Sequence, residues 1–246
     1  MTIDLAIIGG TGLYDFPGLE KVEKHAVDTP FGAASDAITL GELRGRRVAF
    51  LARHAAGHSI PPHRINYRAN IWALHHLGAK RVLGINAVGG IRADMGPRTL
   101  VVPDQIIDYT HGRLSSFCDV DGAKVEHVDF TEPYNAKLRN DLLSAAGRAG
   151  IAVVGGGCYG ATQGPRLETA AEIARMRRDG CDLVGMTGMP EAVLARELNL
   201  DYACLALVAN WAAGCGDQAE ISLPEIFAHL VAATAQVPPI ISSLLS

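Results

Sequence analysis

Four apolar runs in this sequence end in residues suited to bind an anion or a polar ring. The segment GGTG (9–12) follows the first run, Arg53 and His54 close the second, 86–90 closes the third and Asn210 closes the fourth. Glycine-rich turns leave backbone N–H groups open to an anion, and the planar guanidinium of arginine matches phosphate oxygens. The amide of Asn210 both donates and accepts hydrogen bonds, as recognition of a polar ring requires.

Each of these residues also has a plainer interpretation. GGTGLY (9–14) matches neither the G-x-G-x-x-G pattern nor a P-loop, so a tight turn stays open as an alternative to an anion site. Arg53 at a strand end could instead form a surface ion pair. His58 follows His54 at the helical spacing of zinc ligands, but a glycine and two prolines within 57–62 disfavour a helix there. We therefore reject a metal site.

Two further segments place polar side chains where a loop meets a helix. In TQGPRLET (162–169), Glu168 or Thr169 stands near a helix start, which also suits a simple capped loop. In MTGMPEAV (186–193), the proline suits the first helical turn and the glutamate complements the helix dipole. Thr187 is then expected to offer a hydroxyl at a helix N-terminus, a favourable position for an oxyanion.

Short apolar runs alternate with helical patterns along the chain, which indicates a βαβ series and one α/β domain over residues 1–246. In such a sheet the ligand site lies beyond the carboxyl ends of the strands, where the four polar run ends should converge. The irregular stretch 111–130 is expected to be a long functional loop. The expected strands are 5–10, 47–54, 81–90, 99–108, 151–160, 182–188 and 202–210, and the expected helices are 66–78, 134–150, 168–180 and 189–199.

The overall composition narrows the class of partner. Of the 246 residues, 48% are hydrophobic and 20% are charged, which is typical of a soluble globule. The formal net charge of −4 argues against nucleic acid, which needs a basic face. No apolar run approaches the ~20 residues of a spanning helix and no signal segment is visible, so we expect a cytoplasmic protein without a membrane partner. The five cysteines lack C-x-x-C spacing and are expected to be buried free thiols.

Five segments, in this order, resemble the methylthioadenosine phosphorylase branch of the trimeric purine nucleoside phosphorylases. The resemblance extends from residue 5 to about residue 230. It implies a central mixed, mostly parallel sheet flanked by helices, a homotrimer, and phosphorolysis of a purine nucleoside. Phosphate is then the nucleophile and co-substrate, so no cofactor or metal is implied. The segments are IIGGTGL (7–13), LARH (51–54), NYRANIWAL (66–74), TQGPRLET (162–169) and MTGMPEAVLARE (186–197).

The reaction of this family has two electrostatic tasks. The transition state is expected to resemble a ribooxocarbenium ion, so the enzyme must hold phosphate beneath the sugar and donate to the departing base. By resemblance, Asn210, Arg53 and His54 are the catalytic residues. The implied phosphate site is Thr11, Arg53, His54, Asn86, Ala87 and Thr187. The implied nucleoside site is Leu167, Glu168, Met186, Asn210, Trp211, Ala212, Leu223 and Phe227, with His127 reaching in from a neighbouring subunit.

The residues after the run 202–210 bear on the choice of base. Adenine-specific family members carry aspartates at the positions of Asn210 and Ala212, which accept the amino group at C6. Here Asn210 can donate to N7 or to a C6 carbonyl, and Ala212 removes an acceptor, so a 6-oxopurine is favoured. The pattern N-x-A-A-G is similar to that of the methylthioinosine phosphorylase subgroup, with Trp211 where proline is usual.

Three functions stay open at this point. Apolar Leu223 and Phe227 favour a 5′-thiomethyl group over a hydroxyl, which suits methylthioinosine, although such a pocket discriminates by only ~1–3 kcal/mol. A phosphorylase for methylthioadenosine, or for inosine and guanosine, is the second possibility. A catalytically silent nucleoside-binding protein is the third, and the presence of Arg53, His54 and Thr187 disfavours it.

Overall fold

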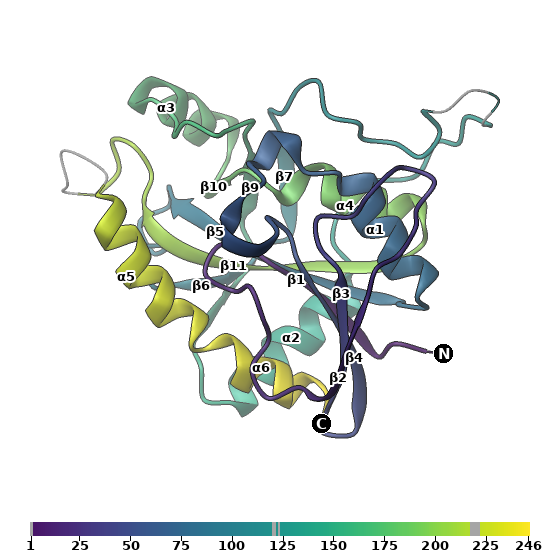
Figure 1. The fold of residues 1–246 in the computed structure, drawn as a ribbon. Helices are drawn as coiled ribbons and strands as arrows, with labels where there is room; N and C mark the ends of the chain where they lie inside the picture. The colour runs from purple at the N-terminus through teal and green to yellow at the C-terminus, as the bar shows by residue number, and fades with distance from the viewer. Residues whose placement is uncertain (1, 120–121, 123, 217–221) are drawn as a thin grey trace.

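One mixed sheet of 11 strands forms the centre of the molecule (Figure 1). The computed structural model describes residues 2–119, 122, 124–216 and 222–246. The main strand order is β2-β3-β4-β1-β5-β10-β9-β7; β11 pairs with β5 and β6, and β6 also pairs with β8. The strands are β1 Leu5–Gly9, β2 Glu20–His25, β3 Ile38–Leu43, β4 Arg46–Ala52, β5 Arg81–Gly90, β6 Leu100–Val102, β7 Gln105–Asp108, β8 Val153–Gly155, β9 Cys158–Ala161, β10 Leu183–Gly185 and β11 Asp201–Trp211.

Helices cover both faces of this sheet. Side chains alternate along β1, so Ala6 and Ile8 join a core with helices α1 and α4, while Leu5 and Ile7 join a core with α2, α5 and α6. Figure 1 shows α1 and α4 on one side of the sheet and α2 and α6 on the other. The helices are α1 Tyr67–His76, α2 Ala136–Arg148, α3 Ala170–Asp179, α4 Gly188–Glu197, α5 Leu223–Thr234 and α6 Val237–Leu244, with short 3₁₀ turns η1 Ala56–His58 and η2 Pro62–Arg64.

The predicted fold class is confirmed, and most predicted elements are present. Two predicted strands were wrong in extent, because each is a pair of short strands. The run 99–108 is interrupted by Pro103, which has no N–H to donate, and the run 151–160 by Gly156 and Gly157, which have positive φ angles. The first halves pair with each other as β6 and β8, and the second halves as β7 and β9. The charged strand β2 was not predicted because it lacks apolar alternation.

The strand β5 changes neighbours along its length. Residues 82–84 pair in parallel with β1, whereas Gly89 and Gly90 pair antiparallel with β10. On the opposite side, β11 pairs with β5 from end to end. On the side of β5 that faces β1 and β10, residues 85–88 pair with none of the described strands. A crevice therefore forms at this edge, where the direction of the sheet switches.

Candidate active site

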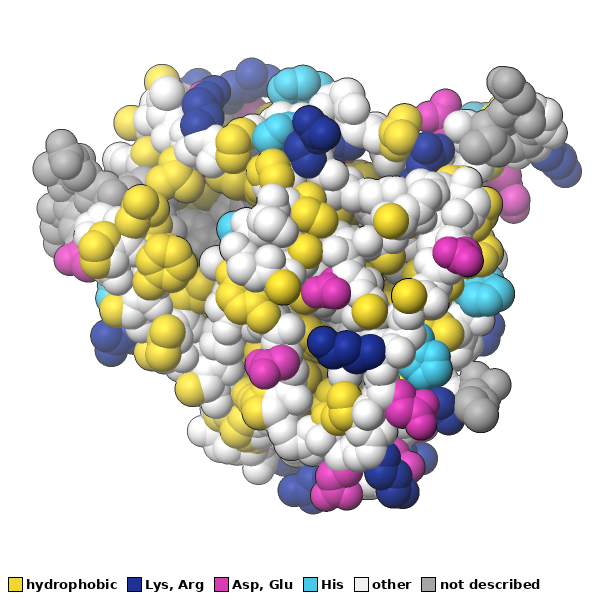
Figure 2. Space-filling view, in the orientation of Figure 1, with side chains coloured by type: hydrophobic (Ala, Val, Ile, Leu, Met, Phe, Trp, Pro, Cys, Tyr) yellow, Lys and Arg dark blue, Asp and Glu magenta, His cyan; other side chains and the backbone are white. Residues whose placement is uncertain are grey.

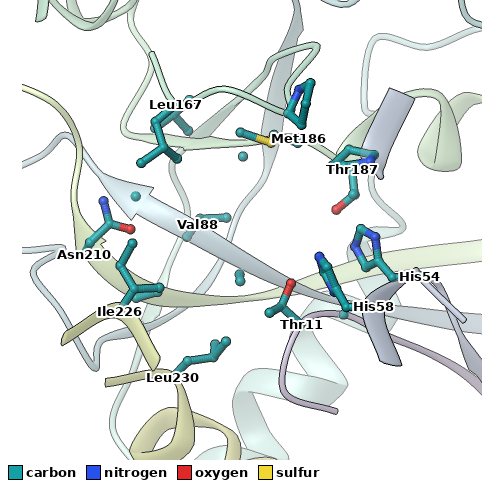
Figure 3. Close-up of a pocket in the computed structure, with 18 of the residues that line it drawn as sticks. Thr11, His54, His58, Val88, Leu167, Met186, Thr187, Asn210, Ile226 and Leu230 are labelled. Carbon is teal, nitrogen blue, oxygen red and sulfur yellow. The ribbon is translucent and has the colours of Figure 1, made fainter. Parts of the chain in front are cut away.

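A cavity of about 540 Å³ opens along the unpaired edge of β5, a volume that suits a small-molecule ligand. Figure 3 shows Thr11, His54, His58 and Thr187 at one end and Leu167, Asn210 and Ile226 at the other. The structure thus brings residues from all four predicted run ends to one place. The predicted residues that line the cavity are Thr11, Arg53, His54, Ala87, Leu167, Glu168, Met186, Thr187, Asn210, Ala212 and Leu223.

The glycine-rich turn after β1 forms part of the polar end. A Cβ atom on Gly10 would lie 2.5 Å from the carbonyl oxygen of Ile85 and 2.9 Å from Nη1 of Arg53. Only glycine therefore lets this turn approach β5 and the guanidinium so closely. Thr11 follows directly and places its hydroxyl in the cavity (Figure 3).

Arg53 is completely buried at this end and pairs with Glu191 of α4. Its Nε donates to Oε1 of Glu191 at 2.7 Å, and its Nη2 donates to Oε2 at 2.9 Å. Nη1 donates to the carbonyl of Ile85 at 2.9 Å, and Nη2 also donates to that of Ile8 at 3.4 Å. Burial is the largest single influence on the pKa of Arg53 and lowers it, but the attraction and hydrogen bonds of Glu191 outweigh burial and raise the pKa. The pair is therefore charged and internally balanced.

This pairing corrects the expected geometry of the phosphate contact. The N–H groups on Nε and Nη2 of Arg53, which together would form a bidentate contact, already donate to Glu191. A bidentate contact of these groups with phosphate is therefore wrong for this structure. One N–H of Nη1 has no partner among the residues that the structure describes, and Arg53 lines the cavity. Arg53 as a phosphate ligand stays a prediction, with one donor. No local pattern indicates this pairing, since the partners stand 138 residues apart.

His54 is buried and neutral. Its Nδ1 lies 2.8 Å from the carbonyl oxygen of Ile60, and because a carbonyl only accepts, Nδ1 carries the hydrogen. Burial, and after it the charge of Arg53, lowers the pKa of His54 to about 4. Nε2 is then an acceptor, able to receive a hydrogen bond from a protonated phosphate oxygen.

His58 also lines the cavity, and sequence reasoning missed this role. Its ring stacks on that of His54 with centroids 4.3 Å apart, and its Nδ1 lies 3.2 Å from the hydroxyl of Tyr14. The spacing of four residues between His54 and His58 could have indicated that both line one site, but we considered it only as the spacing of zinc ligands. Stacked rings do not converge on one ion, and the described residues contain no group of three or more His, Cys, Asp or Glu that could hold a metal.

Asn86 lies behind the cavity wall instead of in it. It is fully buried, and its Nδ2 donates to Oγ1 of Thr187 at 2.7 Å. The thiol of Cys204 donates to Oδ1 of Asn86 at 3.4 Å. Because the Thr187 oxygen already accepts from Asn86, the hydrogen of its O–H group must point to another acceptor. Asn86 thus orients the hydroxyl of Thr187.

Asn210 reaches the other end of the cavity because β11 is irregular there. The register with β5 shifts between Val208 and Asn210, which leaves Ala209 as an extra residue in a β-bulge. Bulges redirect the side chains beside them. Nδ2 of Asn210 donates to the carbonyl of Trp211 at 2.6 Å, which leaves its second N–H and its Oδ1 for a ligand.

Glu168 also lines the cavity, and its carboxylate is held in place by Thr162. The hydroxyl of Thr162 donates to its Oε1 at 2.6 Å. Thr169, not Glu168, caps helix α3: its side chain accepts from the backbone of Glu172, whose carboxylate accepts from the backbone of Thr169. Glu168 is therefore free to act on a ligand.

Besides Asn86, three predicted residues do not line the cavity of their own chain. Trp211 packs over the glycines at 96 and 216. Phe227 is exposed, because the face of α5 that meets the cavity carries Leu223 and the unpredicted Ile226 and Leu230. His127 is exposed in the segment 111–130, whose described residues contain no helix or strand. Their roles toward a ligand stay predictions.

Comparisons with known proteins identify the family of this chain. The phosphorylase superfamily model matches residues 4–237. A probable S-methyl-5′-thioinosine phosphorylase of Xanthomonas campestris is 61% identical over 243 residues, which cover 99% of this chain and 97% of the relative. A 6-oxopurine nucleoside phosphorylase of Pyrococcus furiosus is 51% identical over 215 residues, which cover 85% of this chain and 80% of the relative. The solved structure of methylthioadenosine phosphorylase from Schistosoma mansoni in complex with adenine has a TM-score of 0.94 at 31% identity, covering 99% of this chain and 91% of that one.

Proposed function

Because this chain belongs to the phosphorylase superfamily, we propose that it cleaves the N-glycosidic bond of S-methyl-5′-thioinosine with phosphate. The products are hypoxanthine and 5-methylthioribose 1-phosphate. The observation that carries the choice of base is that Glu168, Asn210 and Ala212 line the same cavity. Phosphate is the co-substrate, and the proposal includes no metal or cofactor.

The two polar residues match the edge of a 6-oxopurine. Hypoxanthine offers an N1–H donor and an O6 acceptor, whereas adenine offers an N1 acceptor and an amino donor. The carboxylate of Glu168 accepts, so it suits N1–H and repels the lone pair of adenine N1. The amide of Asn210 donates to O6 or N7. A buried group left without a partner costs ~1–3 kcal/mol, so a 6-amino substrate is expected to react about tenfold to a hundredfold less efficiently.

The polar end suits the nucleophile. A phosphate oxygen attacks C1′ of the sugar, the bond from C1′ to N9 breaks, and its electron pair passes to the purine. The hydroxyls of Thr11 and Thr187 and the free N–H of Arg53 are donors for phosphate, and Nε2 of His54 accepts from its P–OH group. The amide of Asn210 stabilises the negative charge that develops on the base. Met186 lines the space between the two ends, where the ribose would lie (Figure 3).

We also propose a homotrimer in which His127 of one copy closes the 5′ end of a neighbouring site. Hydrophobic side chains gather over α5 (Figure 2), and Leu223, Phe227 and Val231 are each more than half exposed. The stretch Leu223–Leu244 is long and apolar enough to pass as a membrane span by composition, a test that core helices also pass. A second copy packed on α5 would cover this stripe and complete an apolar pocket for the thiomethyl group.

The cysteines support a cytoplasmic location for this enzyme. Cys118, Cys158, Cys181, Cys204 and Cys215 are all free. Unpaired thiols are typical of a reducing compartment.

The deciding experiment measures phosphate-dependent base release from methylthioinosine, methylthioadenosine, inosine and adenosine side by side. We expect methylthioinosine to have the highest kcat/KM. In the variant carrying Asn210→Asp and Ala212→Asp, preference should move toward methylthioadenosine, because a carboxylate accepts the amino N–H. Glu168→Gln is the matched control for the N1 contact and should lower selectivity without creating that acceptor. Equal kcat/KM for the 6-oxo and 6-amino substrates in the wild type would refute the choice of base.

A further inference from the structure

We propose that Arg113 is a positioning residue that holds several walls of the active site in register, an inference that rests on the proposed function. Arg113 lies in the irregular segment 111–130 and is partly buried. Its five N–H groups make six hydrogen bonds, all to uncharged acceptors. They are the carbonyls of Met186 (2.8 Å), Met189 (2.6 Å), Thr162 (3.1 Å) and Gln163 (2.9 Å), the side-chain oxygen of Gln163 (3.1 Å) and the hydroxyl of Tyr67 (3.2 Å).

Two of these bonds fix the segment that carries Thr187. Arg113 binds the carbonyls of Met186 and Met189, which stand on either side of Thr187 and Gly188 at the junction of β10 and α4. The backbone from the proposed sugar contact to the start of α4 is therefore held at both ends. Asn86 orients the Thr187 hydroxyl, and Arg113 holds the backbone that bears it.

The remaining bonds reach two other walls of the cavity. The carbonyl of Thr162 accepts from Arg113 while its hydroxyl donates to Glu168, the proposed base contact. Tyr67 accepts from Arg113 and donates to the carbonyl of Pro62, which lines the cavity beside the His54 loop. One guanidinium thus touches the supports of the base, sugar and phosphate contacts at once.

Only an arginine can make this arrangement. Its planar fork directs five donors to fixed points, whereas a lysine has three donors on one rotating ammonium. Removing the guanidinium would leave the segments that line the cavity connected by fewer hydrogen bonds, so these segments could shift. A displacement of about 1 Å at reacting groups can lower the rate on the order of 10²-fold. We therefore expect Arg113→Met to lower kcat/KM for the nucleoside by about tenfold to a hundredfold. The KM for phosphate should rise as well.

Arg139 of α2 provides a matched control. It also donates to main-chain carbonyls, those of Pro103 (2.7 Å) and Val102 (3.4 Å), but neither it nor these partners line the cavity. Arg139→Met should lower the melting temperature and leave kcat/KM for the nucleoside and KM for phosphate unchanged. A merely structural role for Arg113 would make the two variants alike.

The test compares the wild type, Arg113→Met, Arg113→Lys and Arg139→Met by steady-state kinetics, by calorimetric titration with phosphate and by thermal unfolding. Arg113→Ala is assayed with millimolar guanidinium, against sodium at the same ionic strength, to replace the missing fork. We expect a loss of kcat/KM in both Arg113→Met and Arg113→Lys, and recovery of Arg113→Ala only by guanidinium. Equal kinetics in Arg113→Met and Arg139→Met, or a Lys variant as active as the wild type, would overturn the inference. If the wild type released no base, the proposed function would be overturned instead. In that case, weaker phosphate binding by Arg113→Met than by Arg139→Met would still support the positioning role of Arg113.

Discussion

Lowering the pH from 7 to 5 is expected to destabilise this protein through His54. Burial, followed by the charge of Arg53, lowers the pKa of His54 from the ordinary 6.5 to about 4. Between these values the unfolded chain binds a proton that the folded protein does not. The stabilising contribution of neutral His54 is therefore present above pH 6.5 and is lost as the pH falls toward 4.

The size of the effect follows from the separation of the two pKa values. A difference of about 2.5 units corresponds to ~3 kcal/mol in the free energy of unfolding, a loss that is complete only below both pKa values. Of this, about 2 kcal/mol is lost between pH 7 and pH 5, because the loss grows by about 1.4 kcal/mol for each pH unit below the pKa of the unfolded histidine. For a domain of this size that is a large share of a typical stability.

The assay is urea unfolding at pH 7, 6 and 5 for the wild type and for His54→Gln. Glutamine can donate to the carbonyl of Ile60 but does not titrate, so the contributions of all other groups cancel in the comparison. The burial that lowers the pKa of His58 is also common to both proteins. We expect the wild type to lose about 2 kcal/mol more than the variant between pH 7 and 5. Equal losses would show that His54 is accessible and titrates normally in the folded state, which would refute the reasoning.

Three further outcomes are expected. Arg53→Leu should destabilise the protein by about 3–5 kcal/mol in urea unfolding, because it leaves Glu191 buried without its partner, and adding Glu191→Leu should restore most of that loss. A double variant no more stable than the single would contradict the balanced pair. Asn86→Ala should raise the KM for phosphate while leaving that for the nucleoside nearly unchanged, since Asn86 acts only through Thr187; steady-state kinetics with each substrate varied will check this. Dilution that dissociates the trimer should lower specific activity through the loss of His127, and a fully active monomer in sedimentation equilibrium would contradict it.

Local features of the sequence determined many elements of this fold and the polar residues at their ends, but not β2, β3, α5 and α6. The apolar run 81–90 coincides with β5, and the run 202–210 lies within β11. Thr169, one of the two residues that the sequence placed near this helix start, caps α3. These features depend on neighbours a few residues apart, through side-chain periodicity and backbone capping, so they can be read without knowing the rest of the chain.

Only the tertiary structure decided how those residues function together. Packing brought Glu191 against Arg53 and placed Asn86 behind Thr187, partners separated by 138 and 101 residues, so their charges and hydrogen bonds cannot be inferred from spacing. The bulge before Asn210 depends on the register of β11 against β5, which the sequence of β11 alone does not specify. The pKa of His54 likewise depends on burial beside Arg53, a property of the assembled core and not of the residue.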